Sequence, residues 1–148
     1  MRTLILLKPD AVQRGLIGDI VSRFEKKGLK IAAMKMLRMT KKKAEDFYSV
    51  HKGKPFYSGL VDYITSGPIV GICLNGNDNV ITVVRTMMGK TNPAEAEKGT
   101  IRADYGIDIG KNTVHGSDST ENAKKEIPIV FCEKDFVLPP FSSLKRKK

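Results

Sequence analysis

Short apolar runs, each about as long as one strand, limit the folds that this chain can adopt. The segments that predict strands are 3–7 (TLILL), 29–39 (LKIAAMKMLRM), 68–74 (PIVGICL) and 128–132 (PIVFC). Helical patterns lie between these runs, in the segments 15–28, 40–50, 58–66, 78–89 and 118–127. Without the shorter helices the order is strand, helix, strand, strand, helix, strand. This order predicts an α+β, ferredoxin-like βαββαβ fold, in which helices cover one face of an antiparallel four-stranded sheet.

Residues at the helix ends support this division of the chain. Thr40 is a typical N-cap residue, and Gly28 and Gly89 suit the C-terminal ends of the helices that precede them. Asp118 and Glu121 have the spacing of a capping box. We therefore expect the last helix to be capped by Asp118.

The length of 148 residues is that of a single domain. We expect residues 1–140 to form this domain and residues 141–148, which end in KRKK, to be a basic tail. No apolar run approaches the length of a membrane span, and the run near the N-terminus is too short for a signal peptide. These features predict a cytoplasmic protein without a membrane partner.

Cysteine and histidine are rare in the chain. The two cysteines, Cys73 and Cys132, lie in apolar runs, which predicts buried reduced thiols rather than a disulfide. No Cys or His pair has the spacing of metal ligands, so we expect no metal ion held by protein side chains alone.

The formal net charge of +10 predicts an acidic partner: a phosphorylated small molecule, a nucleic acid or an acidic membrane. Part of this charge lies in the tail and in the lysine run 41–43. A basic ferredoxin-like domain is compatible with a nucleic-acid-binding module, but the aromatic strand signature of RNA-recognition modules is absent. We therefore expect no specific nucleic-acid partner.

The segment 89–114 shows little periodicity, and loops of this length in a compact domain are usually functional or disordered. It carries Ile101, Tyr105, Ile107 and Ile109, which are more apolar residues than a disordered loop should have. We expect this segment to be ordered and functional.

His115 follows this segment, in residues 112–127 (NTVHGSDSTENAKKEI). The residues after it suit a turn, so a solvated turn histidine is one interpretation. The other is a nucleophile, which requires the second ring nitrogen to be held. Glu126 could hold it with Ser117 as a bridge, or it could be a solvated glutamate on the helix surface. Local sequence does not separate these two readings.

Cationic and polar residues elsewhere suit a phosphoryl group, because phosphoryl transfer depends mainly on positioning and charge neutralisation. These residues are Lys8, Arg85, Thr91, Arg102 and Asn112. Phe56 follows a proline and could stack on a flat ring, although ordinary packing also explains Phe56 and Tyr48. The chain has neither a GxxxxGK phosphate loop nor a dinucleotide fingerprint.

Five stretches resemble nucleoside diphosphate kinases, and they occur in order from residue 3 to about residue 133. They are KPDAVQRGLIG, KPFYSGLVDYITSGPIV, VVRTMMGKTNPAEA, GTIRADYG and NTVHGSDSTENAKKEI. The NxxHGSDS pattern is highly specific to that family. The resemblance implies transfer of the terminal phosphate of a nucleoside triphosphate, typically ATP, to a nucleoside diphosphate. The family does this by a ping-pong mechanism through a phosphohistidine.

The resemblance also implies a role for each matching residue. His115 would be the phosphorylated nucleophile, oriented by Glu126 with Ser117, and Tyr48 would stand close to it. Lys8 and Asn112 would contact the ribose 3′-hydroxyl, with Lys8 also near the terminal phosphate. The phosphate-binding residues would be Arg85, Thr91 and Arg102. The base would lie between Phe56 and Ile109.

The family carries Mg²⁺ chiefly on the nucleotide phosphates, and Asp118 would touch it through water. The family also forms homo-oligomers, either hexamers or tetramers built from dimers. The C-terminal sequence FVLPPFSSLKRKK does not follow that of animal hexamers, so the choice stays open.

The chain departs from the family at Phe47, Lys54 and Thr113, where histidine, arginine and an aliphatic residue are frequent. None of these positions carries the chemistry. An inactive family member kept as a scaffold is the remaining alternative, and the presence of His115 with its expected partners argues against it. The other histidine, His51, is expected at the rim of the base site rather than in catalysis.

Overall fold

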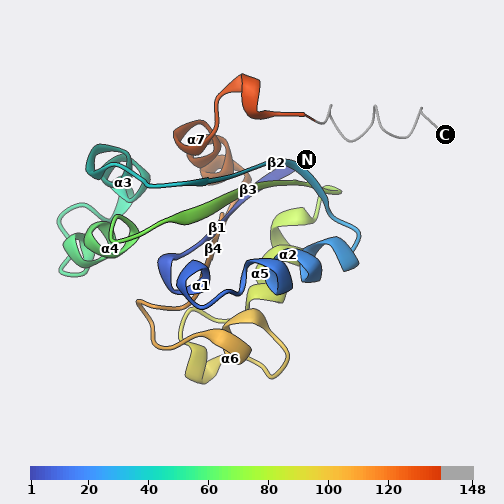
Figure 1. The fold of residues 1–148 in the computed structure, drawn as a ribbon, viewed down its shortest axis with the longest axis horizontal. Coiled ribbons are helices and arrows are strands. Elements are labelled where there is room, and N and C mark those ends of the chain that lie inside the picture. Colours follow the sequence, from blue (N-terminus) through green and yellow to red (C-terminus); the bar gives the residue numbers. More distant parts are fainter. Residues whose placement is uncertain (138–148) are drawn as a thin grey trace.

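The computed structural model describes residues 1–137, and a single antiparallel sheet forms its centre (Figure 1). The strands are β1 (Arg2–Leu7), β2 (Lys30–Leu37), β3 (Ile69–Asn75) and β4 (Val114–Gly116). Their order in the sheet is β2-β3-β1-β4, and each neighbouring pair is antiparallel. This topology confirms the predicted ferredoxin-like fold.

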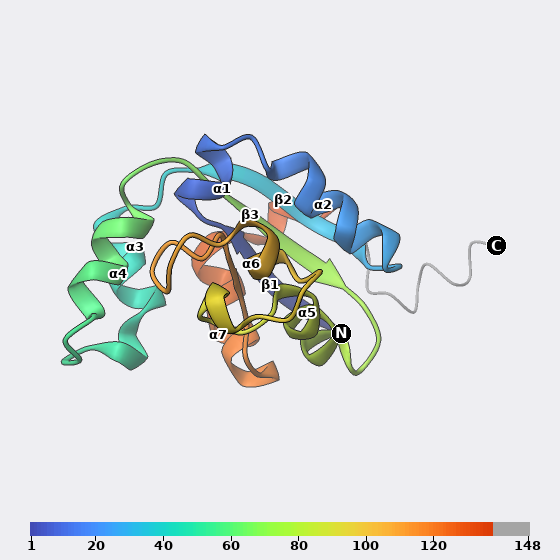
Figure 2. The same ribbon diagram turned by 90° about the horizontal axis from the view of Figure 1, so that it is seen from below.

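Within residues 1–137, six helices lie in the connections between the strands, and a seventh follows β4. They are α1 (Pro9–Gln13), α2 (Ile17–Lys26), α3 (Lys41–Phe47), α4 (Tyr57–Ile64), α5 (Val80–Met88), α6 (Ile101–Tyr105) and α7 (Thr120–Val130). Short 3₁₀ turns span Ser49–His51, Pro93–Glu95 and Glu133–Asp135. In both views α3 and α4 lie side by side, on the side of the sheet away from α2 and α5 (Figures 1 and 2).

Helices cover both faces of the sheet, so the prediction of one covered face was wrong. Leu4 and Leu6 of β1 pack in a cluster with residues of α3, α4 and α7. Ile5 and Leu7, which point to the opposite face, pack in a second cluster with residues of α2 and α5. Every residue of β3 is buried, as expected for a strand covered on both faces.

The predicted last strand, residues 128–132, is not a strand. Residues 128–130 form the end of α7, with Pro128 inside the helix and Val130 buried. The fourth strand is β4, which pairs with β1 and places His115 opposite Leu6. An apolar run this short does not by itself distinguish a strand from the last turn of a helix. β4 is too short to show any periodicity of its own.

The cap of α7 also differs from the prediction. Ser119, rather than Asp118, is the N-cap residue, and its side chain accepts a hydrogen bond of 3.0 Å from the backbone N–H of Asn122. Thr40 caps α3 as predicted, accepting from the N–H of Lys43 at 3.2 Å. Aspartate and serine are both preferred at N-caps, so residue type alone could not decide whether Asp118 or the adjacent Ser119 caps α7.

The remaining predictions have mixed outcomes. Cys73 is buried as expected, and burial raises the pKa of its thiol to about 11, whereas Cys132 is exposed. No helix within residues 1–137 is long and apolar enough to cross a membrane. The predicted basic tail, residues 141–148, and the domain end at residue 140 lie outside the described residues.

Candidate active site

A cleft of about 540 Å³ opens beside β4, between the α3–α4 pair on one side and α5, α6 and α7 on the other. It gathers residues that lie far apart in the sequence. The predicted site residues that line it are Lys8, Tyr48, Phe56, Arg85, Thr91, Arg102, Ile109, Asn112, His115 and Glu126. The remaining predicted residue, Ser117, is fully buried behind the lining. The structure therefore brings the predicted site residues to one place.

His115 lies on β4, and its ring is held by a residue of α7. The Nε2 atom of His115 lies 3.0 Å from Oε1 of Glu126. The hydroxyl of Ser117 donates to the same Oε1 at 2.7 Å and accepts a longer hydrogen bond, 3.4 Å, from the N–H of Leu4. Because a carboxylate only accepts hydrogen bonds, this contact places the proton on Nε2 and leaves the lone pair on Nδ1.

Packing also restrains the histidine ring. The ring of Phe47 meets it edge-on, with 4.9 Å between the centroids and 69° between the planes. A Cβ at Gly116, the next residue, would lie 2.7 Å from the sulfur of Met88, so a larger residue there would displace the Met88 side chain of α5. Tyr48 is buried nearby, and burial together with the charge of Glu126 raises the pKa of its hydroxyl, which stays protonated.

Three cationic side chains converge on the same cleft. Lys8 donates to the side-chain oxygen of Asn112 at 2.8 Å. Arg102 donates to the carbonyls of Gly89 at 2.9 Å and Val114 at 2.8 Å. Arg85 donates to the carbonyl of Gly116 at 3.3 Å. These hydrogen-bond partners are all neutral groups, and the nearby carboxylate of Asp10 balances only part of the charge of Lys8.

The electrostatics of these cations indicate an anion site. Burial, with the charge of Arg102, lowers the pKa of Lys8 to about 8. Burial, with the charge of Arg85, lowers the pKa of Arg102 to about 10. The Nε of Arg102 is also buried and has no hydrogen-bond partner within residues 1–137. Cations that repel one another in a cleft favour a ligand with several negative charges, such as a polyphosphate.

The mouth of the cleft is apolar and aromatic. Phe56 and Ile109 line it and are 51% and 59% exposed. His51 lines the same region, with its ring centroid 5.2 Å from that of Phe56. An exposed apolar pair at the mouth of a cationic cleft is suited to a flat ring attached to an acidic group.

Sequence reasoning missed a buried hydrogen-bond network beneath the cleft. The hydroxyl of Thr113 donates to Asp10 at 2.9 Å, and the hydroxyl of Tyr63 donates to the other carboxylate oxygen of Asp10 at 2.6 Å. Thr113 has a φ of 78°, and Val114 donates from its backbone N–H to the carbonyl of Asn112 at 2.9 Å. This is the hydrogen bond of a γ-turn, a rare conformation that carries strain. No local sequence pattern predicts this network, because Asp10, Tyr63 and Thr113 lie in separate parts of the chain.

Comparison with known proteins identifies the family. A family model described as nucleoside diphosphate kinase matches residues 1–136. The chain belongs to the nucleoside diphosphate kinase family. Members of this family are transferases that phosphorylate nucleoside diphosphates, and the chain is a transferase of this kind. The resemblance seen in the sequence is thereby confirmed.

Curated relatives match over nearly their whole length. The chain is 55% identical to a nucleoside diphosphate kinase of Heliobacterium modesticaldum over 136 residues, which cover 92% of this chain and 91% of the relative. It is 56% identical to one of Staphylothermus marinus over 136 residues, covering 92% and 96%.

Solved structures of the family share the fold. The nucleoside diphosphate kinase of Aquifex aeolicus superposes with a TM-score of 0.89 at 45% identity, over 92% of this chain and 98% of that one. The halophilic enzyme of Halobacterium salinarum, solved in complex with CDP, gives a TM-score of 0.90 at 43% identity, over 98% and 97%. Likeness at this level, with this identity, agrees with the ferredoxin-like architecture described above.

Proposed function

We propose that the chain transfers the terminal phosphate of a nucleoside triphosphate, typically ATP, to a nucleoside diphosphate by a ping-pong mechanism through a phosphohistidine at His115. One observation carries this proposal. The contact of His115 with Glu126 frees Nδ1 as a nucleophile, and it does so in the cleft that holds Lys8, Arg85 and Arg102. A nucleophile and a polyphosphate site therefore share one cavity.

In the first half-reaction, the lone pair of Nδ1 attacks the terminal phosphorus. The bond from that phosphorus to the bridging oxygen breaks, and the oxygen leaves with the electron pair as part of the nucleoside diphosphate. The proton on Nε2 remains there, and the positive charge that develops on the ring is stabilised by Glu126. In the second half-reaction, a terminal oxygen of another nucleoside diphosphate attacks the phosphohistidine, and the nitrogen–phosphorus bond breaks.

The other residues bind and orient the nucleotide. Arg85, Thr91 and Arg102 hold the phosphates, since their side chains line the cationic part of the cleft. The hydrogen-bonded pair Lys8 and Asn112 contacts the ribose 3′-hydroxyl, and Lys8 also approaches the terminal phosphate.

Aromatic and aliphatic residues complete the nucleotide site. Phe56 and Ile109 hold the base by its two faces, which their place at the mouth of the cleft supports. The Tyr48 hydroxyl, kept protonated, donates toward His115 or the transferred phosphate.

The donor set of the cleft suits a magnesium ion that the nucleotide carries. Within residues 1–137 there is no group of three or more His, Cys, Asp or Glu side chains that could hold a metal ion. Asp118 lines the cleft and could reach such an ion through water. When bound, Mg²⁺ neutralises part of the phosphate charge, in addition to the charge supplied by Arg85 and Arg102.

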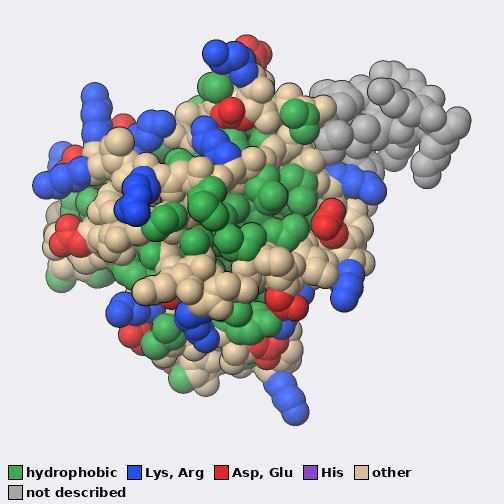
Figure 3. All heavy atoms as spheres, viewed as in Figure 1, with side chains coloured by type: hydrophobic (Ala, Val, Ile, Leu, Met, Phe, Trp, Pro, Cys, Tyr) green, Lys and Arg blue, Asp and Glu red, His purple; other side chains and the backbone are tan. Residues whose placement is uncertain are grey.

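Exposed apolar side chains support a homo-oligomer, either a hexamer or a tetramer built from dimers. Met34 and Met36 of β2 are 49% and 59% exposed, and β2 is at the edge of the sheet. Figure 3 shows apolar side chains gathered at the centre of one face of the molecule. An exposed sheet edge with apolar side chains is a common site of subunit contact. The mass in solution, measured by light scattering, would distinguish these assemblies from a monomer.

The phosphoenzyme is the direct test of the mechanism. The protein is mixed with Mg²⁺ and ATP labelled in the terminal phosphate, without an acceptor. We expect an acid-labile, base-stable label on His115 and release of an equal amount of ADP. Addition of a nucleoside diphosphate should then remove the label from the protein. A protein that transfers phosphate between nucleotides without ever carrying the label would contradict the proposal.

A further inference from the structure

Arg102, whose guanidinium lines the proposed phosphate site, is on a very short helix. Helix α6 has five residues, of which Ile101 and Arg102 are buried. A helix of this length is not stable by itself, so its position depends on contacts with its neighbours. The inner side of α6 is held by Arg102, whose contacts are the carbonyls of Gly89 and Val114.

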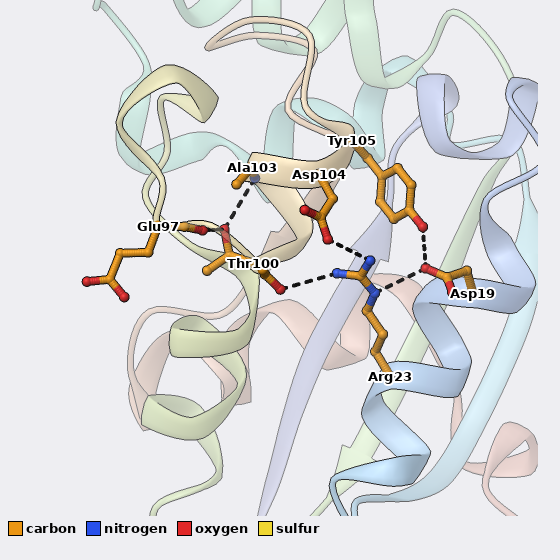
Figure 4. Close-up of polar contacts among 8 residues, drawn as sticks. Asp19, Arg23, Glu97, Thr100, Ala103, Asp104 and Tyr105 are labelled. Atoms are coloured by element: carbon orange, nitrogen blue, oxygen red, sulfur yellow. Dashed lines mark hydrogen bonds and ion pairs between the residues drawn. The ribbon is translucent and has the colours of Figure 1, made fainter.

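The outer side of α6 is held by Arg23, a residue of α2. The guanidinium of Arg23 donates to the carboxylate of Asp104 at 2.7 Å and to the carbonyl of Gly99 at 3.5 Å. Its central carbon lies 5.0 Å from the centre of the Tyr105 ring. One side chain therefore contacts the segment just before α6 and the residues at its C-terminal end, as Figure 4 shows.

Residues around Arg23 hold it in this position. Asp19, one turn earlier on α2, accepts from Nε of Arg23 at 3.0 Å and also accepts a hydrogen bond from the hydroxyl of Tyr105. Arg14, at the end of α1, donates to the backbone carbonyl of Tyr105 at 2.6 Å. The contact between α2 and α6 is thus a network rather than a single surface ion pair, and networks hold geometry better than isolated pairs do.

We propose that Arg23, with Asp19, Asp104 and Tyr105, is a positioning cluster for Arg102. The cluster holds α6 against α2 from outside, and so it places the guanidinium of Arg102 at the phosphate site on the other side of the same helix. None of the four residues lines the cleft, so none of them is a catalytic residue. The proposal rests on the phosphate-binding role proposed for Arg102.

Substitution of Arg23 tests the cluster. We expect Arg23→Ala to weaken ADP binding in calorimetry and to lower kcat/KM by about fivefold or more, as residues coupled in one network do. Cleavage by trypsin at lysines of the segment 89–111 should also become faster. Lys27→Ala, which changes an exposed lysine at the C-terminal end of α2, is the matched control and should leave all three measurements unchanged.

A double-mutant cycle separates coupling from general damage. Asp104→Ala should resemble Arg23→Ala, and the double variant should lose little more than either single variant, because both changes break the same contact. Tyr105→Phe, which removes only the hydroxyl, should have a smaller effect. If Arg23→Ala does not fold, Asp104→Ala and Tyr105→Phe still measure the network from the side of α6. Losses that simply add would overturn the proposal.

Arg102→Ala in the same assays separates this inference from the proposed function. If Arg102→Ala leaves ADP affinity unchanged, the phosphate-binding role of Arg102 is wrong. If Arg102→Ala weakens binding while Arg23→Ala and Asp104→Ala bind ADP and turn over within about twofold of the unaltered protein, the positioning cluster is wrong.

Discussion

His115 and Glu126 are on different elements, β4 and α7, and their side chains meet with 3.0 Å between Nε2 and Oε1. The same Oε1 accepts a hydrogen bond from the hydroxyl of Ser117, the residue that follows β4. One carboxylate oxygen of Glu126 therefore contacts both His115 and Ser117. This arrangement gives the imidazole one orientation and one tautomer.

Glu126→Ala should slow the phosphorylation of His115 without weakening nucleotide binding. The ring would be free to rotate and to adopt the other tautomer, and losses of such supporting contacts typically cost on the order of 10- to 100-fold. Single-turnover measurement with saturating ATP would report this rate. Glu126→Gln should fall between the two, because an amide oxygen still accepts a hydrogen bond but carries no charge. If the alanine variant is phosphorylated at the normal rate, Glu126 does not orient His115.

His115→Ala should abolish transfer and keep nucleotide binding, because Lys8, Arg85 and Arg102 remain in place. The measurement is turnover, with ADP affinity from calorimetry as the control. Arg102→Ala should instead impair both binding and rate, since phosphate charge is present in the ground state and in the transition state. Sizeable turnover by the His115 variant would mean that the nucleophile has been assigned to the wrong residue.

Activity should fall as the pH rises through about 8, the pKa of Lys8 in the free protein. Above this pH Lys8 loses its charge, so kcat/KM should decrease. The decrease in kcat should come at higher pH, because bound phosphates favour the charged lysine. A profile of kcat/KM that is flat from pH 7 to about 9.5 would contradict this assignment.

The free energy of unfolding should show the opposite trend with pH. The pKa of Lys8 is about 8 in the folded protein, against 10.5 for an ordinary lysine. Between these pH values the unfolded chain binds more protons than the folded one, so the stability contributed at this position rises with pH. Lys8→Met should remove this part of the dependence. Urea denaturation of both proteins from pH 7 to about 10 would measure the difference.

The enzyme should accept nucleotides with different bases at similar rates. Phe56 and Ile109 offer apolar surfaces at the mouth of the cleft, and stacking on such surfaces discriminates poorly among bases. Phe56→Ala should therefore raise KM for every base by a similar factor. A hundredfold preference of the unaltered protein for one base, at equal sugar, would refute this expectation.

Much of the fold could be predicted from the sequence because β1, β2 and β3 are apolar runs of strand length and the longer helices show helical periodicity. The error at residues 128–132 arose because PIVFC contains too few residues to show either period. The true fourth strand, β4, is shorter still and is defined by its pairing with β1, which no local pattern encodes. The second covered face was missed for a similar reason: burial on both sides of β3 depends on which helices pack there.

The sequence by itself determined the residue types of the site and their order, since NxxHGSDS and the accompanying cations occur in family-specific stretches. It left open whether Glu126 supports His115 or faces solvent. Only the tertiary structure decided this, because the contact requires α7 to pack against the sheet, where a Cβ at Gly71 would lie 2.7 Å from Val130. The tertiary structure likewise lowers the pKa values of Lys8 and Arg102, because it buries both side chains and places other cations near them. Residue identity sets which chemistry is available, and packing sets the distances and the solvent exposure that make it effective.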